Sequence, residues 1–138
     1  MNYAALKKFD IANGPGVRVS LFVSGCRHRC KNCFNSEAWD FSYGKPFTEE
    51  TKNEIINALT PDHIEGFSLL GGEPFEPENQ EQLSLLLKEI KTKLPKKTVW
   101  CYTGFLFDDQ LLSGKVGDLK TVHRMLKNID VLVDGKFV

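Results

Sequence analysis

Three cysteines lie within eight residues of the sequence and form a compact set of metal-ligating side chains. They are Cys26, Cys30 and Cys33, spaced C-x3-C-x2-C, and they follow an apolar segment that is typical of a strand. Thiolates hold iron–sulfur clusters, and a [4Fe–4S] cluster usually takes four of them. Three local thiolates would leave one iron open to a substrate, so the spacing indicates chemistry at a metal rather than simple electron transfer.

Other interpretations of the cysteines are weaker but stay open. A structural zinc site would need a fourth ligand, for which His28 or the remaining thiol, Cys101, is available. A ferredoxin-like carrier would need a fourth cysteine near the run, and the sequence has none there. Disulfides are disfavoured because three clustered cysteines cannot all pair and because residues 1–10 are polar, unlike a secretory signal. We therefore expect a reducing, cytoplasmic location.

The length and charge of the chain limit the partners that it can have. At 138 residues we expect one domain, spanning 1–138, with a single core. The 18 basic and 18 acidic residues cancel, so no overall field draws the chain to nucleic acid or to an anionic membrane. No apolar stretch approaches the roughly 20 residues of a membrane-spanning helix. Binding must therefore occur at a local site.

Strand and helix signals alternate along the chain after the turn-forming residues 13–16. Thr48 is suited to cap a helix that ends before Pro61, and leucines recur at helical spacing between Pro77 and Pro95. Apolar and β-branched runs predict the strands. The expected order is strand 17–23, helix 48–59, strand 66–70, helix 77–94, strand 98–102, helix 119–129 and strand 131–133. This alternation predicts an α/β fold with right-handed crossovers and a parallel sheet.

Polar or glycine-containing motifs follow the carboxyl ends of all four predicted strands. They begin at Cys26, Gly71, Thr103 and Asp134. Parallel strands would place these motifs on one edge of the sheet, which is where ligands bind in open α/β sheets and α/β barrels. Ordinary turn chemistry explains the Asp134 motif about as well. We therefore expect a binding site at this edge, to which Cys26, Gly71 and Thr103 contribute most clearly.

The Gly71-Gly72-Glu73-Pro74 turn has the composition to receive a cationic amino group. Two glycines allow positive φ and a close approach of a ligand to the main chain, and Glu73 adds a carboxylate. Thr103 offers a hydroxyl for a ribose or a carboxylate, and Gly104 beside it leaves space. This turn and the end of the strand 98–102 are therefore predicted to contact a ligand.

The fourth cysteine and the basic residues around the thiolates have simpler expected environments. Cys101 lies between Trp100 and Tyr102 in a predicted strand, so we expect an inert buried thiol outside the metal site. A solvated loop face is expected for the basic residues of the run. These are Arg27, His28, Arg29 and Lys31.

The cysteine run and the Gly-Gly-Glu-Pro turn together resemble the radical S-adenosylmethionine superfamily. The resemblance implies a partial, open α/β barrel of parallel strands with crossover helices. It implies that Cys26, Cys30 and Cys33 hold a [4Fe–4S] cluster whose fourth iron chelates the methionine part of S-adenosyl-L-methionine, with no catalytic residue beyond cluster and cofactor. The turn would contact the cofactor's amino group, and Phe34 would stack on its adenine. The residues implied around the cofactor are Asn32, Cys33, Phe34, Gly71, Gly72, Glu73, Thr103 and Asp134.

Segments spread over the whole chain resemble one family within that superfamily. They are 13–18, 21–26, 34–35, Trp39, 71–74, 102–104 and 133–137. They look like the activating proteins of the anaerobic ribonucleoside-triphosphate reductases, which are glycyl-radical enzyme activases. The resemblance implies an oxidoreductase that takes a low-potential electron from a flavodoxin-like or similar donor. It would cleave S-adenosylmethionine to a 5′-deoxyadenosyl radical and so create the glycyl radical on the class III reductase.

Two alternatives and one departure accompany this resemblance. An activase of another glycyl-radical enzyme, such as pyruvate formate-lyase, would share the mechanism, whereas a zinc-binding interaction module would not. Members of the family usually continue past the Asp-Gly-x-Phe segment into a short tail with Arg-Gly-Ser and Asn-Gln. This chain stops at Val138. We therefore expect the single domain to lack that tail.

Overall fold

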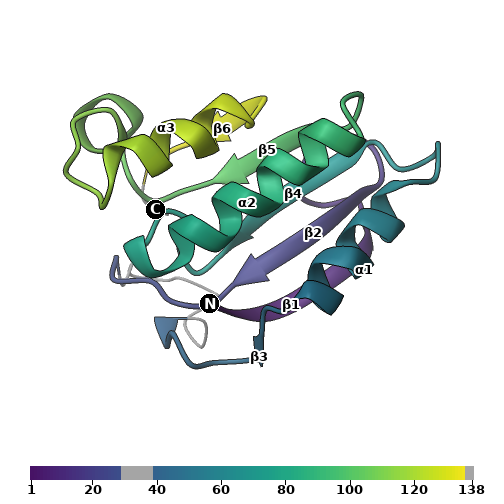
Figure 1. Cartoon of the computed structure of the whole chain (residues 1–138), viewed down its shortest axis with the longest axis horizontal. Coiled ribbons are helices and arrows are strands. Elements are labelled where there is room, and N and C mark those ends of the chain that lie inside the picture. Colours follow the sequence, from purple (N-terminus) through teal and green to yellow (C-terminus); the bar gives the residue numbers. More distant parts are fainter. Residues whose placement is uncertain (29–38, 136–138) are drawn as a thin grey trace.

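A computed structural model describes residues 1–28 and 39–135 of the chain. In these residues a six-stranded mixed sheet has the order β3-β1-β2-β4-β5-β6 (Figure 1). The strands are β1 (Asn2–Asp10), β2 (Arg18–Val23), β3 (Lys45–Pro46), β4 (Gly66–Gly71), β5 (Thr98–Tyr102) and β6 (Val131–Val133). The helices are α1 (Glu49–Leu59), α2 (Pro77–Lys93), α3 (Leu119–Lys127) and a π-helical turn, η2 (Phe107–Leu111).

The four strands that the sequence predicts do pair in parallel. β2 pairs with β4, β4 with β5, and β5 with β6, each in the parallel direction. The first two pairings run continuously from Arg18↔Gly66 and from Gly66↔Thr98. The carboxyl ends of β2, β4, β5 and β6 therefore lie at the same edge of the sheet, as predicted.

The expectation of a wholly parallel sheet is wrong for the strands that lie beyond β2, on the side away from β4. β1 pairs antiparallel with both β2 and β3, and neither β1 nor β3 is predicted from the sequence. β1 is partly buried over residues 2–6 and exposed over residues 7–9, so polar residues interrupt the alternation that marks a strand. The mixed six-stranded sheet is what the described residues form, and the open barrel stays a prediction.

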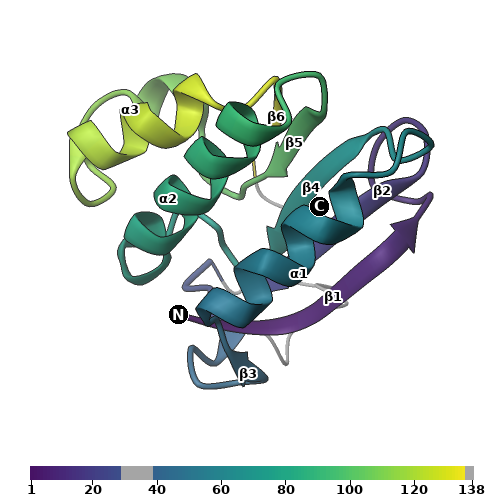
Figure 2. The ribbon, with the colours of Figure 1, turned by 45° about the vertical axis from the view of Figure 1, so that its right-hand side comes forward.

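The three α-helices pack on one face of the sheet (Figures 1 and 2). Successive side chains of a strand point to opposite faces, so alternate apolar residues face the helices. The core that they form contains Val19, Leu21 and Val23 of β2, Phe67 and Leu69 of β4, Val99 and Cys101 of β5, Ile55 and Leu59 of α1, Leu83, Leu86, Leu87 and Ile90 of α2, and Val122 and Met125 of α3. Each of these side chains has no measurable exposure.

The helices begin where the sequence predicts. Thr48 caps α1 in a reciprocal pair, in which the Thr51 N–H donates to Thr48 Oγ1 at 3.4 Å and the Thr48 N–H donates to Thr51 Oγ1 at 3.2 Å. Pro77 occupies the first turn of α2, where its missing N–H is not needed. No helix in the described part of the chain is long and apolar enough to cross a membrane.

The face of the sheet opposite the helices carries a fully buried arginine, Arg18, at the start of β2. Its Nε donates to Ser68 Oγ at 2.8 Å, and its Nη2 donates to the carbonyls of Phe67 at 3.1 Å and Thr98 at 2.9 Å. Burial lowers the pKa of the guanidinium below its usual value. One side chain thus connects the amino ends of β2, β4 and β5.

Arg18 also explains the loop that precedes β2. Its Nη1 donates to the Pro15 carbonyl at 3.1 Å, and Ser68 Oγ donates to the Asn13 carbonyl at 2.6 Å. Gly14 has a φ of +127°, and a Cβ there would lie 2.9 Å from Arg18 Cδ. The glycine is therefore required by the close approach of the loop to the arginine.

Replacement of Arg18 by alanine should destabilise the fold strongly. Arg18→Ala would leave the Ser68 hydroxyl and three main-chain carbonyls without this donor, so we expect the free energy of unfolding to fall by about 2–4 kcal/mol. Denaturant unfolding measures the change. Arg124→Ala removes the same side chain from an exposed position on α3 and should change the value by less than about 0.5 kcal/mol. Equal effects of the two substitutions would contradict the assigned role of Arg18.

Candidate functional site

The Glu73 carboxylate lies with no exposed surface at the carboxyl ends of the parallel strands. Its Oε1 accepts from the Gly104 N–H at 2.6 Å and lies 2.8 Å from His28 Nε2. Its Oε2 accepts from the Phe75 N–H at 2.8 Å and from Thr103 Oγ1 at 2.7 Å. A carboxylate offers about four acceptor positions. The protein itself occupies all four.

These contacts bring the predicted strand-end motifs together. The glutamate belongs to the Gly-Gly-Glu-Pro turn after β4, and its partners come from the cysteine run after β2 and from the end of β5. The end of β6 joins them, because the Thr103 N–H donates to the Val133 carbonyl at 2.9 Å and the Phe107 N–H donates to Asp134 Oδ2 at 2.9 Å. The motifs that begin at Cys26, Gly71, Thr103 and Asp134 therefore meet at one edge of the sheet.

Two further side chains of α2 and its preceding turn fix the start of the cysteine run. Glu76 accepts from the Arg27 main-chain N–H at 2.6 Å and from Arg27 Nη1 at 2.9 Å. Asn79 Nδ2 donates to the carbonyls of Ser24 at 3.0 Å and Glu73 at 3.1 Å. Neither Glu76 nor Asn79 is among the predicted site residues. A signal was present for Asn79, which precedes the buried Leu83 by four residues and so puts a polar group on the buried stripe of α2.

His28 does not lie on a solvated loop face, and this expectation is wrong for it. Its side chain is 8% exposed, against 58% for Arg27. The ring packs edge-on against Phe105 with 4.4 Å between centroids. A Cβ at Gly104 would lie 2.6 Å from His28 Cδ2, so this glycine makes room for the histidine. The reason is the Glu73 carboxylate, which lies 45 residues away in the sequence and gives the imidazole a buried partner.

Gly71 is required by the approach of two strands. Its φ is +121°, and a Cβ there would lie 2.4 Å from the Val23 main-chain N. The positive φ of Gly71 is thus as predicted, but the chain that approaches it closely is the end of β2, and the approach of a ligand stays a prediction. Gly71 therefore lets the Gly-Gly-Glu-Pro turn lie directly beside the chain that leads into the cysteine run.

The described cysteines lie in two different environments. Cys26 is 8% exposed, follows the end of β2, and donates its N–H to the Trp39 carbonyl at 3.1 Å. Cys101 is fully buried in the helix-facing core. Burial first, and then the negative charge of Glu73, raise the pKa of the Cys101 thiol well above its ordinary value. Cys101 is therefore an inert buried thiol, as predicted.

Part of the predicted site lies outside the described residues. This part comprises Cys30, Asn32, Cys33 and Phe34. Among the residues that are described, no three His, Cys, Asp or Glu side chains are grouped to hold a metal ion. Thr103 is 5% exposed, and its hydroxyl donates to Glu73 and accepts from the Phe105 N–H at 3.1 Å. Asp134 is exposed.

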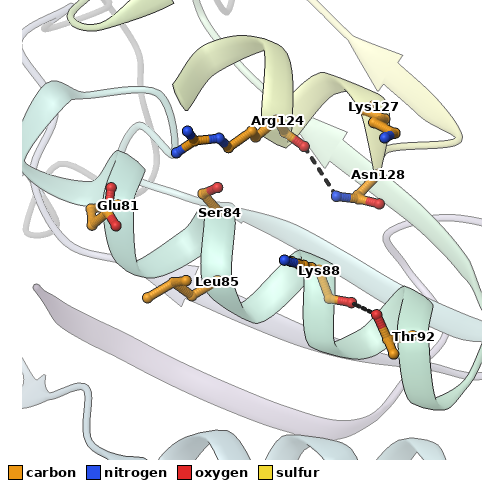
Figure 3. Close-up of a pocket in the computed structure, with 8 residues that line it drawn as sticks. All are labelled: Glu81, Ser84, Leu85, Lys88, Thr92, Arg124, Lys127 and Asn128. Atoms are coloured by element: carbon orange, nitrogen blue, oxygen red, sulfur yellow. Dashed lines mark hydrogen bonds between the residues drawn. The ribbon is translucent and has the colours of Figure 1, made fainter. Parts of the chain in front are cut away.

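A cavity of about 420 Å³ lies elsewhere, between α2 and α3 on the helical side of the sheet (Figure 3). It is lined by Glu81, Ser84, Leu85, Lys88, Thr92, Arg124, Lys127 and Asn128. None of the predicted site residues lines it. The candidate site is therefore defined by the converging strand ends and not by this cavity.

Comparison with known proteins agrees with the thiolate chemistry of the run. Residues 12–138 match the family model of a 4Fe-4S single cluster domain, so the chain is of the iron–sulfur class. It is 39% identical over 137 residues to the anaerobic ribonucleoside-triphosphate reductase-activating protein of Enterobacteria phage T4, covering 99% of this chain and 81% of that protein. The proteins of the same name from Escherichia coli K12 and Vibrio cholerae are 41% and 40% identical, over 100% of this chain and 86% and 85% of theirs. The chain belongs to the family of anaerobic ribonucleoside-triphosphate reductase-activating proteins.

The raised pKa of Cys101 predicts a loss of stability at alkaline pH. An unfolded thiol ionises with a pKa of about 8.5. The buried thiol keeps its proton to a higher pH, so the unfolded state is favoured as pH rises through that range. This group should have no effect at neutral pH, and above about pH 9 it should lower the free energy of unfolding by about 1.4 kcal/mol per pH unit.

Denaturant unfolding of the wild type and of Cys101→Ala from about pH 7 to about pH 10, under reducing conditions, measures this effect. The other titrating groups are shared by both proteins, so they cancel in the difference. The alanine variant should be the less stable protein at neutral pH because of its cavity, and the gap should narrow as the pH rises. A gap that does not change with pH would contradict the prediction.

Proposed function

We propose that this protein is a radical S-adenosylmethionine activase that generates the glycyl radical of an anaerobic, class III ribonucleotide reductase. The observation that carries the proposal is the convergence of the cysteine run, the Gly-Gly-Glu-Pro turn and the end of β5 on the buried Glu73 carboxylate. The names of the relatives supply the partner, the anaerobic ribonucleoside-triphosphate reductase. We further propose a flavodoxin-like or similar electron donor and a cytoplasmic location.

The residues present suit the proposed cluster and cofactor. Cys26 supplies a thiolate at the strand-end edge, where little of its surface meets solvent, and Cys30 and Cys33 supply the other two. When bound, the cluster and S-adenosylmethionine supply a 5′-deoxyadenosyl radical by one-electron cleavage of the sulfonium, with methionine as the other product. The family's 4Fe-4S domain supports the iron–sulfur part of this assignment.

The proposed roles around the cofactor differ between main chain and side chain. The main-chain groups of Gly71 and Gly72 would receive the amino group of the methionine part. The hydroxyl of Thr103 already donates a hydrogen bond to the carboxylate of Glu73. The contribution of these two side chains is therefore to shape the turn that receives the amino group. The other proposed contacts are Asp134 at the end of β6 and Asn32, Cys33 and Phe34 in the run, with Phe34 stacked on adenine.

The activation reaction itself tests the proposed function. Reduced protein, S-adenosylmethionine and the anaerobic reductase, mixed without oxygen, should give a glycyl-radical doublet by electron paramagnetic resonance and release 5′-deoxyadenosine. Alanine in place of Cys26, Cys30 or Cys33 should abolish both signals, because each removes a cluster ligand. Cys101→Ala is the matched control and should keep the cluster and the activity.

Other outcomes of this experiment separate the alternatives. If 5′-deoxyadenosine forms and pyruvate formate-lyase is activated in place of the reductase, the partner is wrong and the radical mechanism stands. A colourless protein that binds zinc and does not respond to dithionite would favour the interaction module. A colourless Cys101→Ala protein would show that the assignment of three ligands is incorrect.

Substitution of Gly72 tests the proposed place of the amino group. Gly72→Val adds bulk where the main chain must approach the ligand, so S-adenosylmethionine binding should weaken by about tenfold or more, while the iron content stays that of the wild type. Anaerobic titration calorimetry with the cluster-loaded protein gives the affinity, and the visible spectrum monitors the cluster. Unchanged affinity would remove Gly72 from the site.

A further inference from the structure

His28 occupies a special place in the cysteine run. It lies two residues after Cys26 and two residues before Cys30 in the sequence. Its side chain is 8% exposed, although it belongs to a loop that otherwise carries charged residues. It has two neighbours from distant parts of the chain, the Glu73 carboxylate at 2.8 Å and the Phe105 ring at 4.4 Å between centroids. This imidazole therefore links the start of the run to the turn that contains Glu73 and to the end of β5.

The site accepts only a carboxylate at position 73. Each oxygen faces one main-chain N–H, that of Gly104 at Oε1 and that of Phe75 at Oε2. An amide in either orientation would turn its NH2 group toward one of these donors. Thr103 Oγ1 accepts from the Phe105 N–H and so donates to Glu73. With donors on both oxygens, His28 contributes its Nε2–H.

We propose that Glu73 and His28 are positioning residues for the metal, and that their contact orients the start of the cysteine run, residues 26–28, for cluster binding. The proposal rests on the proposed function, because it assigns these residues a part in holding the cluster. Hydrogen bonds from outside the ligand set commonly fix the geometry of metal ligands, and their loss weakens metal binding by about 10–100-fold. Glu73 thereby acts on the metal site through His28.

Neighbouring contacts hold the residues that precede His28, so the contact between His28 and Glu73 acts on a main chain that is already fixed on one side. Ser24 and Arg27, on the amino-terminal side of His28, are held by Asn79 and Glu76 through main-chain hydrogen bonds of 3.0 Å and 2.6 Å. His28 is the next residue along the chain and lies two residues before Cys30 in the sequence. Loss of its contact with Glu73 would remove the attachment of the run at His28.

Iron release tests the proposal without relying on activity. The reconstituted proteins are mixed anaerobically with a ferrous chelator, and the rate of iron transfer is measured. His28→Phe keeps a ring against Phe105 and loses the donor. Glu73→Gln replaces one accepting oxygen with an NH2 group that must face a donor, so it disturbs the contact from the other side. Both should release iron about 10–100-fold faster than the wild type. His28→Gln places an amide N–H near the position of Nε2 and should restore slow release.

Further controls separate positioning from folding. Glu81→Gln removes one exposed carboxylate from α2 and should release iron at the wild-type rate. The double variant His28→Phe/Glu73→Gln should be no faster than the faster single variant, since both remove one contact. Thermal melts of the iron-free proteins identify variants that do not fold. If Glu73→Gln fails to fold, the comparison of His28→Phe with His28→Gln shows whether the pair positions the run.

Three results would overturn the inference. They are wild-type release from His28→Phe, equally fast release from His28→Phe and His28→Gln, and single effects that multiply in the double variant. The electron paramagnetic resonance spectrum of the reduced cluster should also change in His28→Phe and return in His28→Gln. A wild-type protein that retains no iron would instead overturn the proposed function, so the two failures are distinguishable.

Discussion

A carboxylate with no exposed surface must find its hydrogen-bond donors inside the protein, and Glu73 finds four. They come from three segments that are far apart in the sequence: the cysteine run, the turn that contains the glutamate, and the end of β5. The three segments cannot move apart without leaving a buried charge unpaired, which is far more costly than the loss of one surface contact. This constraint gives the carboxyl ends of the parallel strands a single arrangement.

A second buried charge acts at the opposite ends of the same strands. Arg18 connects the amino ends of β2, β4 and β5, while Glu73 connects the segments that follow their carboxyl ends. Apolar burial between strands and helices is a non-directional interaction, so it determines only which face of the sheet the helices cover. The two buried charges add direction, because each is satisfied only when its own loops lie in one place. Residues 13–15 before β2 and residues 24–28 after it are therefore held by specific polar contacts as well as by packing.

Much of the fold is readable from local patterns, and the rest depends on partners that are distant in the sequence. Thr48 caps α1 and the leucines of α2 are buried because such signals act within one or two turns. The meeting of Cys26, Gly71 and Thr103 at one edge is predictable because parallel pairing alone brings the carboxyl ends of their strands together. β1 is missed because its charged residues are tolerated in a strand only once β2 pairs with them. The burial of His28 is missed for the same reason, since a histidine in a basic loop is solvated unless a distant carboxylate receives it.

The contacts at the start of the cysteine run bear on how a metal site can form there. Ser24 is held by Asn79 of α2, Arg27 by Glu76 directly before α2, and His28 by Glu73 of the Gly-Gly-Glu-Pro turn, and none of these contacts involves the metal. Fixing the main chain of a residue costs about 1–2 kcal/mol of conformational entropy. Where the fold has already met that cost around Cys26, less of the free energy of metal binding is spent on ordering the ligands. The turn proposed for the cofactor and the start of the run proposed for the cluster are thus parts of one hydrogen-bonded unit, so a substitution in one should change the geometry of the other.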